Sequence, residues 1–148
     1  MIKEYIHRPT YLEKIRPFIG KGVIKVIVGQ RRVGKSYFLF QLMDEIRRQD
    51  KKAEIVYISK ELSEFEEIKT GKDLLDYIAK KKNGSRPLHI FIDEIQEIIG
   101  FEKALRHLAA KGKDDIYCTG SNAFLLSSEL ATRLAGRYVE MQMHSLSF

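Results

Sequence analysis

Short apolar runs rich in β-branched residues alternate with amphipathic segments from about Gly22 onward. The runs at residues 23–28, 54–59, 88–92, 115–119 and 138–143 have the length and composition of strands. After the first run, apolar residues at offsets of three, four and seven share one helical face: Leu39, Leu42, Met43 and Ile46. Further helices are predicted over residues 73–81, 101–110 and 122–134. This alternation predicts an α/β fold, a parallel sheet with helices packed around it.

Residues 1–21 precede the first strand and predict a helical segment beside the core, which occupies residues 22–148. Thr10 and Glu13 have the spacing of a capping box that starts a helix, and Pro17 would end or kink that helix. A chain of 148 residues can bury one good core but is too short for two ordinary domains. We therefore expect one domain.

A phosphate-binding loop follows the first predicted strand. Residues 29–36 fit the pattern G-x-x-x-x-G-K-[ST] and stand between a strand and a helix, as its mechanism requires. Glycines let the backbone approach phosphate oxygens, and the N-terminus of the next helix favours an anion. Lys35 is expected to reach the β and γ phosphates of a nucleotide, and Ser36 to bind Mg²⁺. The predicted nucleotide-binding residues are Gly29, Gln30, Arg31, Arg32, Val33, Gly34, Lys35, Ser36 and Tyr37.

Two acids end the third predicted strand, which is almost entirely apolar. An acidic residue at such a strand end typically holds the Mg²⁺ of a P-loop enzyme, and we assign that role to Asp93. Glu94 would then face the γ-phosphate, where a carboxylate can act as the base that activates water. The competing interpretation is that both acids only start the next helix, where negative charge is favourable.

Small polar residues and two arginines follow later strands. Ser121 and Asn122 come after the fourth strand and could sense the γ-phosphate, although both are also good helix N-caps. Arg133 and Arg137 flank the residues just before the fifth strand. Arginine suits the charge that develops during phosphoryl transfer, in the same chain or a neighbouring one, so Arg137 is included among the catalytic candidates. Either arginine could instead form a structural ion pair.

Composition narrows the remaining classes of function. Cys118 is the only cysteine, which rules out an intramolecular disulfide and disfavours a zinc site. No apolar stretch is long enough for a membrane span and no signal peptide is visible, so a cytoplasmic location without membrane contact is expected. The net charge of +6 suits phosphate partners. Much of it could equally be solvated helix surface, because cations are favoured near helix C-termini.

These motifs together resemble the fourteenth AAA domain family, predicted bacterial and archaeal ATPases. The segments that carry the resemblance are residues 29–36, 92–96, 119–122 and 134–137, and it covers nearly the whole chain. It implies a P-loop three-layer sandwich with a five-stranded parallel sheet in the order 5-1-4-3-2. It also implies glutamate-assisted hydrolysis of ATP with Mg²⁺, by a domain of the switch or motor kind.

The resemblance also bears on partners. Relatives continue past the final Ser-Phe into a C-terminal domain that often resembles a DNA-binding module, and that domain is absent from these 148 residues. DNA is thus a partner to consider through the missing domain, and a homo-oligomer is a further one.

Three other functions have sequence requirements of their own. A small-molecule kinase would need a lid insertion, and none is visible between the strands. A GTPase would need an Asn-Lys-x-Asp segment, which the sequence lacks. The main alternative is an ATP-regulated nucleic-acid-binding or scaffold module with little turnover, although no aromatic stacking run or zinc module supports it.

Overall fold

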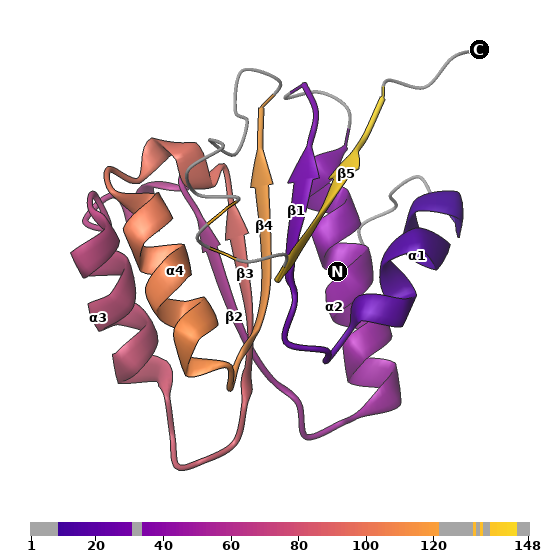
Figure 1. Cartoon of the computed structure of the whole chain (residues 1–148), viewed down its shortest axis with the longest axis horizontal. Coiled ribbons are helices and arrows are strands. Elements are labelled where there is room, and N and C mark those ends of the chain that lie inside the picture. Colours follow the sequence, from indigo (N-terminus) through magenta and orange to yellow (C-terminus); the bar gives the residue numbers. More distant parts are fainter. Residues whose placement is uncertain (1–8, 31–33, 122–131, 133, 135–136, 145–148) are drawn as a thin grey trace.

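The computed structural model describes residues 9–30, 34–121, 132, 134 and 137–144. Within these residues, five strands alternate with four α-helices and three short 3-10 helices, which Figure 1 shows arranged around the sheet. In chain order the elements are α1 Pro9–Ile15, η1 Arg16–Phe18, β1 Ile24–Val28, α2 Lys35–Gln49, β2 Glu54–Ser59, η2 Ser63–Phe65, α3 Gly71–Lys81, β3 Leu88–Asp93, η3 Ile95–Glu97, α4 Phe101–Lys111, β4 Asp115–Gly120 and β5 Tyr138–Gln142. No helix in this part of the chain is long and apolar enough to span a membrane.

The strands form one parallel sheet in the order β2-β3-β4-β1-β5, which confirms the predicted architecture and strand order. β4 therefore separates the strand that leads into the phosphate loop from the strand that ends in Asp93. The predicted strands agree with the observed ones to within one residue at each end. The helix predicted over residues 122–134 falls mostly outside the described residues, of which Thr132 and Leu134 are helical.

Side chains on the two faces of the sheet enter two separate cores. Val26 and Ile92 face the core under α3 and α4, whereas Ile27 and Phe91 face the core under α1 and α2. Successive residues of a strand point to opposite faces, so a strand buried on both sides is almost continuously apolar. Figure 1 shows α3 and α4 grouped at one side of the sheet and α1 and α2 at the other. This arrangement is the expected three-layer sandwich.

The first helix does not start at the predicted capping box. Helix α1 already includes Pro9, so Thr10 lies inside it and cannot cap it. Proline is favoured in a first helical turn, and here that signal prevails over the Thr10–Glu13 spacing. Pro17 does end α1, because the chain tightens there into η1. A capping box is present instead at α3, where Thr70 and Asp73 each accept a hydrogen bond from the other's backbone N–H.

A buried polar cluster centres on Asp115 near the amino end of the sheet. Its carboxylate accepts hydrogen bonds from Lys25 Nζ, from Gly20 N at 3.0 Å and from the Tyr117 hydroxyl at 2.5 Å, and His89 Nδ1 lies 3.2 Å away. Burial alone raises the pKa of Asp115, but the hydrogen bonds and the positive charge of Lys25 hold that pKa below its usual value. The cluster therefore contains a buried, paired carboxylate that joins β1, β3 and β4.

Close packing between the start of α3 and the start of α4 depends on Gly71. A Cβ atom at this position would lie 2.6 Å from the carbonyl oxygen of Gly100, and Gly71 N donates to Ile99 O at 2.7 Å. Gly71→Ala is expected to lower the free energy of unfolding by about 1–3 kcal/mol, the usual cost of forcing extra atoms into a packed site. Urea unfolding measures this, with exposed Lys72→Ala as the control within about 0.5 kcal/mol of the parent. An unchanged or stabilised Gly71→Ala protein would refute the close approach.

Candidate nucleotide site

The carboxyl ends of β1, β4 and β3 bring three polar segments together at one edge of the sheet. Gly29 follows β1, and its backbone N–H donates to Gly120 O at the end of β4 at 3.1 Å. Asp93 is the last residue of β3. The order of the strands thus places the phosphate loop, the end of β4 and the two acids side by side, which is where ligands bind in open parallel sheets.

Lys35 is the first residue of α2, and its side chain is held at the centre of this edge. Gly34 before it has a φ of 89°, a left-handed conformation that glycine adopts without steric cost. The Lys35 ammonium donates to Gly29 O and to Gly120 O, the latter at 2.8 Å, and lies 3.0 Å from Glu94 Oε1. Only 2% of Lys35 is exposed. The buried cation therefore has three oxygen partners.

The carboxylate oxygens of Asp93 accept hydrogen bonds from hydroxyl groups of two different elements, α2 and β4. Ser36 Oγ donates to Asp93 Oδ2 and Thr119 Oγ1 donates to Asp93 Oδ1, each at 2.5 Å. Tyr57 on β2 lies close enough for its burial and the Asp93 charge to raise the pKa of Tyr57 to about 12. The two oxygen atoms of Asp93 therefore have separate hydroxyl partners, and Oδ2 lies directly beside the Ser36 hydroxyl.

Glu94 adopts a conformation that costs energy for a residue with a side chain. Its φ of 57° and ψ of 55° are left-handed, and it is the only non-glycine residue with positive φ in the described part of the chain. Such a conformation costs roughly 1–2 kcal/mol. Its backbone N–H donates to Thr119 Oγ1 at 2.9 Å, so Thr119 links both acids. Strained residues of this kind cluster at functional sites.

The two carboxylate oxygens of Glu94 have different partners. Oε1 faces Lys35, whereas Oε2 accepts a hydrogen bond from Gln96 Nε2 at 2.5 Å. Gln96 Oε1 is the one buried side-chain polar atom without a hydrogen-bond partner among the described residues. An unpartnered buried acceptor carries a cost of about 1–3 kcal/mol. Gln96 therefore orients the Glu94 carboxylate, and its unpartnered Oε1 lowers the stability of the fold.

Most of the predicted site residues that the structure describes lie at this edge. Gly29, Gly34, Lys35, Ser36, Asp93 and Glu94 come together there, with Ser121 just beyond the end of β4 and partly exposed. Gln30 and Tyr37 are exposed beside them. Arg31, Arg32, Val33 and Asn122 lie outside the described residues, as does Arg133.

Arg137 is the predicted catalytic residue that the structure does not bring to this edge. Its carbonyl oxygen accepts from Ile24 N at 2.8 Å, and Ile24 is the first residue of β1. Because β1 and β5 are parallel, the beginning of β5 lies at the opposite end of the sheet from the phosphate loop. A role for Arg137 in the same chain therefore has no support from the geometry, and only the neighbouring-chain alternative stays a prediction.

Two residues beside the acids, Tyr57 and Gln96, were given no role from the sequence, and Thr119 was considered only as one of the small polar residues at 119–122. Thr119 belongs to the segment 119–122 that carries the family resemblance. A threonine at the end of the strand expected beside the Asp93 strand could have indicated a contact with the two acids. Tyr57 sits within an alternating strand pattern that looks structural. Its position near Asp93 depends on the register in which β2 pairs with β3, which the sequence does not predict.

Comparisons with known proteins agree with this architecture. A family model described as an AAA domain matches residues 21–148. An uncharacterized protein of Haemophilus influenzae is 41% identical over 150 residues, which cover all of this chain and 38% of that protein. An uncharacterized protein of Methanocaldococcus jannaschii is 37% identical over 127 residues, covering 84% of this chain and 27% of that protein. The chain thus spans less than two fifths of the length of either relative.

Solved structures show the same fold at lower identity. Domain III of the replication initiation protein DnaA from Thermotoga maritima superposes with a TM-score of 0.58 at 18% identity. That match covers 95% of this chain and 65% of the DnaA chain. PCH-2 of C. elegans superposes with a TM-score of 0.55 at 20% identity, covering 86% of this chain and 36% of PCH-2.

Proposed function

The chain belongs to the AAA domain family, and from this membership we propose that it binds Mg²⁺-ATP at residues 29–37 and hydrolyses it to ADP and phosphate. The observation that carries the proposal is the convergence of Lys35, Ser36, Asp93 and Glu94 at one edge of the sheet. A cation, a hydroxyl and two carboxylates in this arrangement are the groups that phosphoryl transfer requires. The same edge presents the N-terminus of α2, whose unpaired N–H groups favour an anion.

Lys35 supports the proposal through the partners it already has. Its ammonium group contacts two carbonyl oxygens and one carboxylate oxygen, so it is oriented toward oxygen atoms on the phosphate-loop side. When ATP binds, we propose that β- and γ-phosphate oxygens replace Glu94 as partners of Lys35. This exchange keeps the cation paired throughout and releases the Glu94 carboxylate for catalysis.

The residues at this edge fit a magnesium ion. Ser36 Oγ and Asp93 Oδ2 are hard oxygen donors in direct contact, and Mg²⁺ usually takes only one or two protein ligands beside phosphates and water. Bound there, the ion would neutralise charge on the phosphates. Thr119 holds the other oxygen of Asp93, Oδ1, so the carboxylate is positioned before the ion arrives.

Glu94 is proposed as the base. The oxygen of a water molecule forms a bond to the γ-phosphorus while the bond from that phosphorus to the bridging oxygen of ADP breaks. The proton lost by the water passes to the Glu94 carboxylate, and the electron pair of the broken bond remains on ADP. Gln96 Nε2 keeps hold of Glu94 Oε2, which orients the other oxygen. Ser121 and Asn122 follow β4 and are proposed to sense the γ-phosphate, with one of them capping the next helix.

Arg137 is proposed to act on a neighbouring copy of the chain. Its side chain is exposed at the end of the sheet opposite its own phosphate loop, so it can reach only another molecule's site. The family membership also suggests a switch or motor role for the complete protein, in which hydrolysis changes contacts between domains. Those contacts would involve parts of the relatives that this chain does not span.

The test is Mg²⁺-dependent release of phosphate from ATP and from GTP by the purified chain. We expect turnover of ATP in preference to GTP, abolished by EDTA, with a Lys35→Ala protein purified in parallel as the control for contaminating ATPases. If Arg137 acts between copies, the rate per chain rises with protein concentration. Equal rates from wild type and Lys35→Ala would sink the proposal, and a rate per chain independent of concentration would remove the role of Arg137.

A further inference from the structure

The loops at the amino end of the sheet, opposite the nucleotide edge, carry a group of exposed cations. Five of them lie outside the helices: Lys21, Lys51, Lys52, Arg86 and Lys113. We call these five residues the basic rim. Figure 1 shows the loops that carry them at one end of the molecule, away from the carboxyl ends of β1 and β4. The rim plays no part in the proposed chemistry.

The loops of the rim form one continuous surface. A hollow of about 240 Å³ is lined by Lys52, Arg86 and Lys113 together with Gly20 and Gly22, which flank Lys21. Arg86 Nη1 donates to Lys52 O at 3.0 Å, so the loop before β3 is tied to the loop before β2. The five cations are therefore neighbours in space although they come from four separate loops.

Helix dipoles do not explain these five positions. Cations in the last turn of a helix are favoured by the partial negative charge there, which accounts for Arg47, Arg48, Lys80 and Lys111. Rim residues stand beyond that turn. They add to the helix-end cations on the same side of the molecule rather than replacing them.

Asp50, Glu54, Asp114 and Asp115 also line the hollow, and three of these four acids are engaged. Asp114 pairs with Lys82 Nζ at 2.7 Å, and Asp115 pairs with buried Lys25. Asp50 Oδ1 accepts the backbone N–H of Lys52 at 3.0 Å. By contrast, the segment after β2, at the nucleotide edge, is rich in acids: Glu61, Glu64, Glu66 and Glu67. Among the described residues, exposed cations therefore gather in the loops at the amino end of the sheet, whereas these four exposed acids lie at its carboxyl end.

The chemistry of this surface selects its partner. Protein interfaces are anchored by buried aromatic and apolar side chains. The large exposed apolar residues in the described part of the chain are Tyr37, Leu62 and Ile99. All three lie at the nucleotide edge. Tyr37 is in the first turn of α2, Leu62 follows β2, and Ile99 lies between η3 and α4. A surface of mobile lysine and arginine side chains without apolar anchors suits a regular array of phosphates.

We propose that the basic rim binds the phosphate backbone of nucleic acid without reading its base sequence. Lys51, Lys52 and Lys113 contact phosphates from two loops, and Arg86 adds a guanidinium between them. The inference is independent of ATP hydrolysis, because no rim residue touches the nucleotide edge. Binding through phosphates alone is strongly salt-dependent, with a slope of about 0.9 in log Kd per log salt for each phosphate neutralised.

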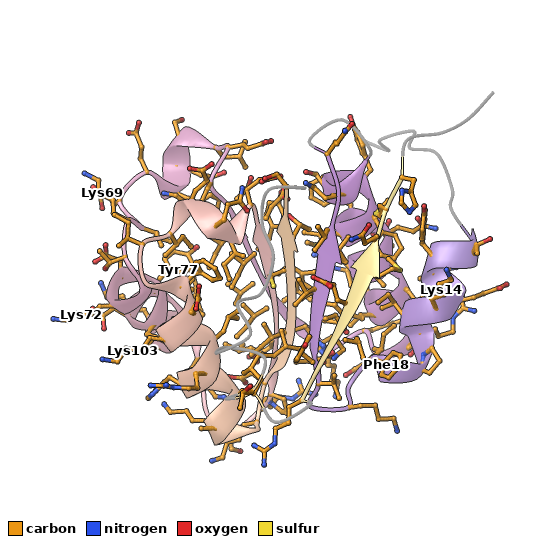
Figure 2. The ribbon with its side chains drawn as sticks, turned by 45° about the horizontal axis from the view of Figure 1, so that its top comes forward. Lys14, Phe18, Lys69, Lys72, Tyr77 and Lys103 are labelled. Carbon is orange, nitrogen blue, oxygen red and sulfur yellow. The ribbon has the colours of Figure 1, made fainter. Side chains whose placement is uncertain are left out.

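The experiment uses fluorescence anisotropy with a labelled duplex of arbitrary sequence, from about 50 mM to 200 mM salt. The test variant is Lys51→Ala/Lys52→Ala/Lys113→Ala. The matched control is Lys69→Ala/Lys72→Ala/Lys103→Ala, which removes the same charge from the side of α3 and α4. Figure 2 shows these three control lysines pointing outward there. Urea unfolding and ATP binding confirm that both variants are folded.

We expect wild type to bind the duplex with a micromolar Kd at low salt. The rim variant should bind roughly tenfold or more weakly, and the control variant less than threefold more weakly. The slope of log Kd against log salt should be lower by about 2.7 in the rim variant. Absence of binding at 50 mM salt would overturn the proposal. So would equal weakening in both variants, which would indicate only a general effect of net charge. Equal competition by poly-L-glutamate at matched charge would assign the rim to an acidic protein instead.

Discussion

Replacing Glu94 with glutamine is expected to lower ATP turnover by about 10²- to 10⁴-fold, the usual contribution of a general base, while ATP still binds. Glutamine has the same shape but cannot accept the proton of the attacking water. Its unchanged backbone N–H still donates to Thr119 Oγ1. Glutamine also removes the negative charge that pairs with Lys35, so phosphate oxygens compete for Lys35 more easily and ATP is expected to bind at least as tightly as to wild type.

Single-turnover phosphate release and equilibrium binding of a fluorescent ATP analogue separate the two effects. Glu67→Gln, an exposed acid on the segment after β2, is the matched control and should behave as wild type. A Glu94→Gln protein that turns over ATP at the wild-type rate would mean that another group is the base. One that no longer binds ATP would mean that Glu94 serves the structure of the loop rather than the chemistry.

Removing the carboxylate of Asp115 is expected to cost about 3–5 kcal/mol of unfolding free energy. Asp115→Ala would leave Lys25, which is fully buried, without its counter-charge. It would also leave Gly20 N and the Tyr117 hydroxyl without their shared acceptor. Breaking one partner of a buried pair costs far more than removing an exposed charge, since the remaining charge is stranded away from water. Asp76→Ala on the surface of α3 should change little.

Urea unfolding of Asp115→Asn, Lys25→Met and the double variant tests the pairing directly. Lys25→Met should cost less in the Asp115→Asn background than in wild type, because contacting residues couple. The pKa of folded Asp115 lies below its unfolded value of about 3.9. Its contribution is therefore present above about pH 4 and is lost as pH falls through the folded pKa. Asp115→Asn should therefore lose less unfolding free energy than wild type as pH falls below about 4. The pairing would be contradicted if the two single substitutions were additive and this pH dependence were unchanged.

The sequence predicted the fold and the main chemical groups because local patterns carried both. The apolar run at β3 ends in Asp93 and Glu94, and the glycine motif ends in Lys35 and Ser36. Each of these signals lies within a few residues. The strand order and the family came from resemblance to known sequences, and the structure and the family model confirm them.

What the sequence did not predict depends on residues far apart in the chain. Lys25 and Asp115 are 90 positions apart, and their pairing needs β1 and β4 to be neighbours in the right register. The same holds for Thr119 and Asp93. The capping prediction failed in both directions: the pattern at Thr10 predicted a box that is not formed, and the box of Thr70 and Asp73 was not predicted. Capping patterns are short enough to arise by chance in any helix.

The position of β1 has a consequence for how the chain acquires its structure. Both hydrogen-bonding edges of this strand are taken by β4 and β5, which come from the last third of the chain. During synthesis, residues 24–28 therefore emerge long before any strand that can pair with them. Closing such long loops is slow, and an unpaired apolar strand invites wrong contacts meanwhile. The phosphate loop should thus be among the last parts of this domain to take shape on the ribosome.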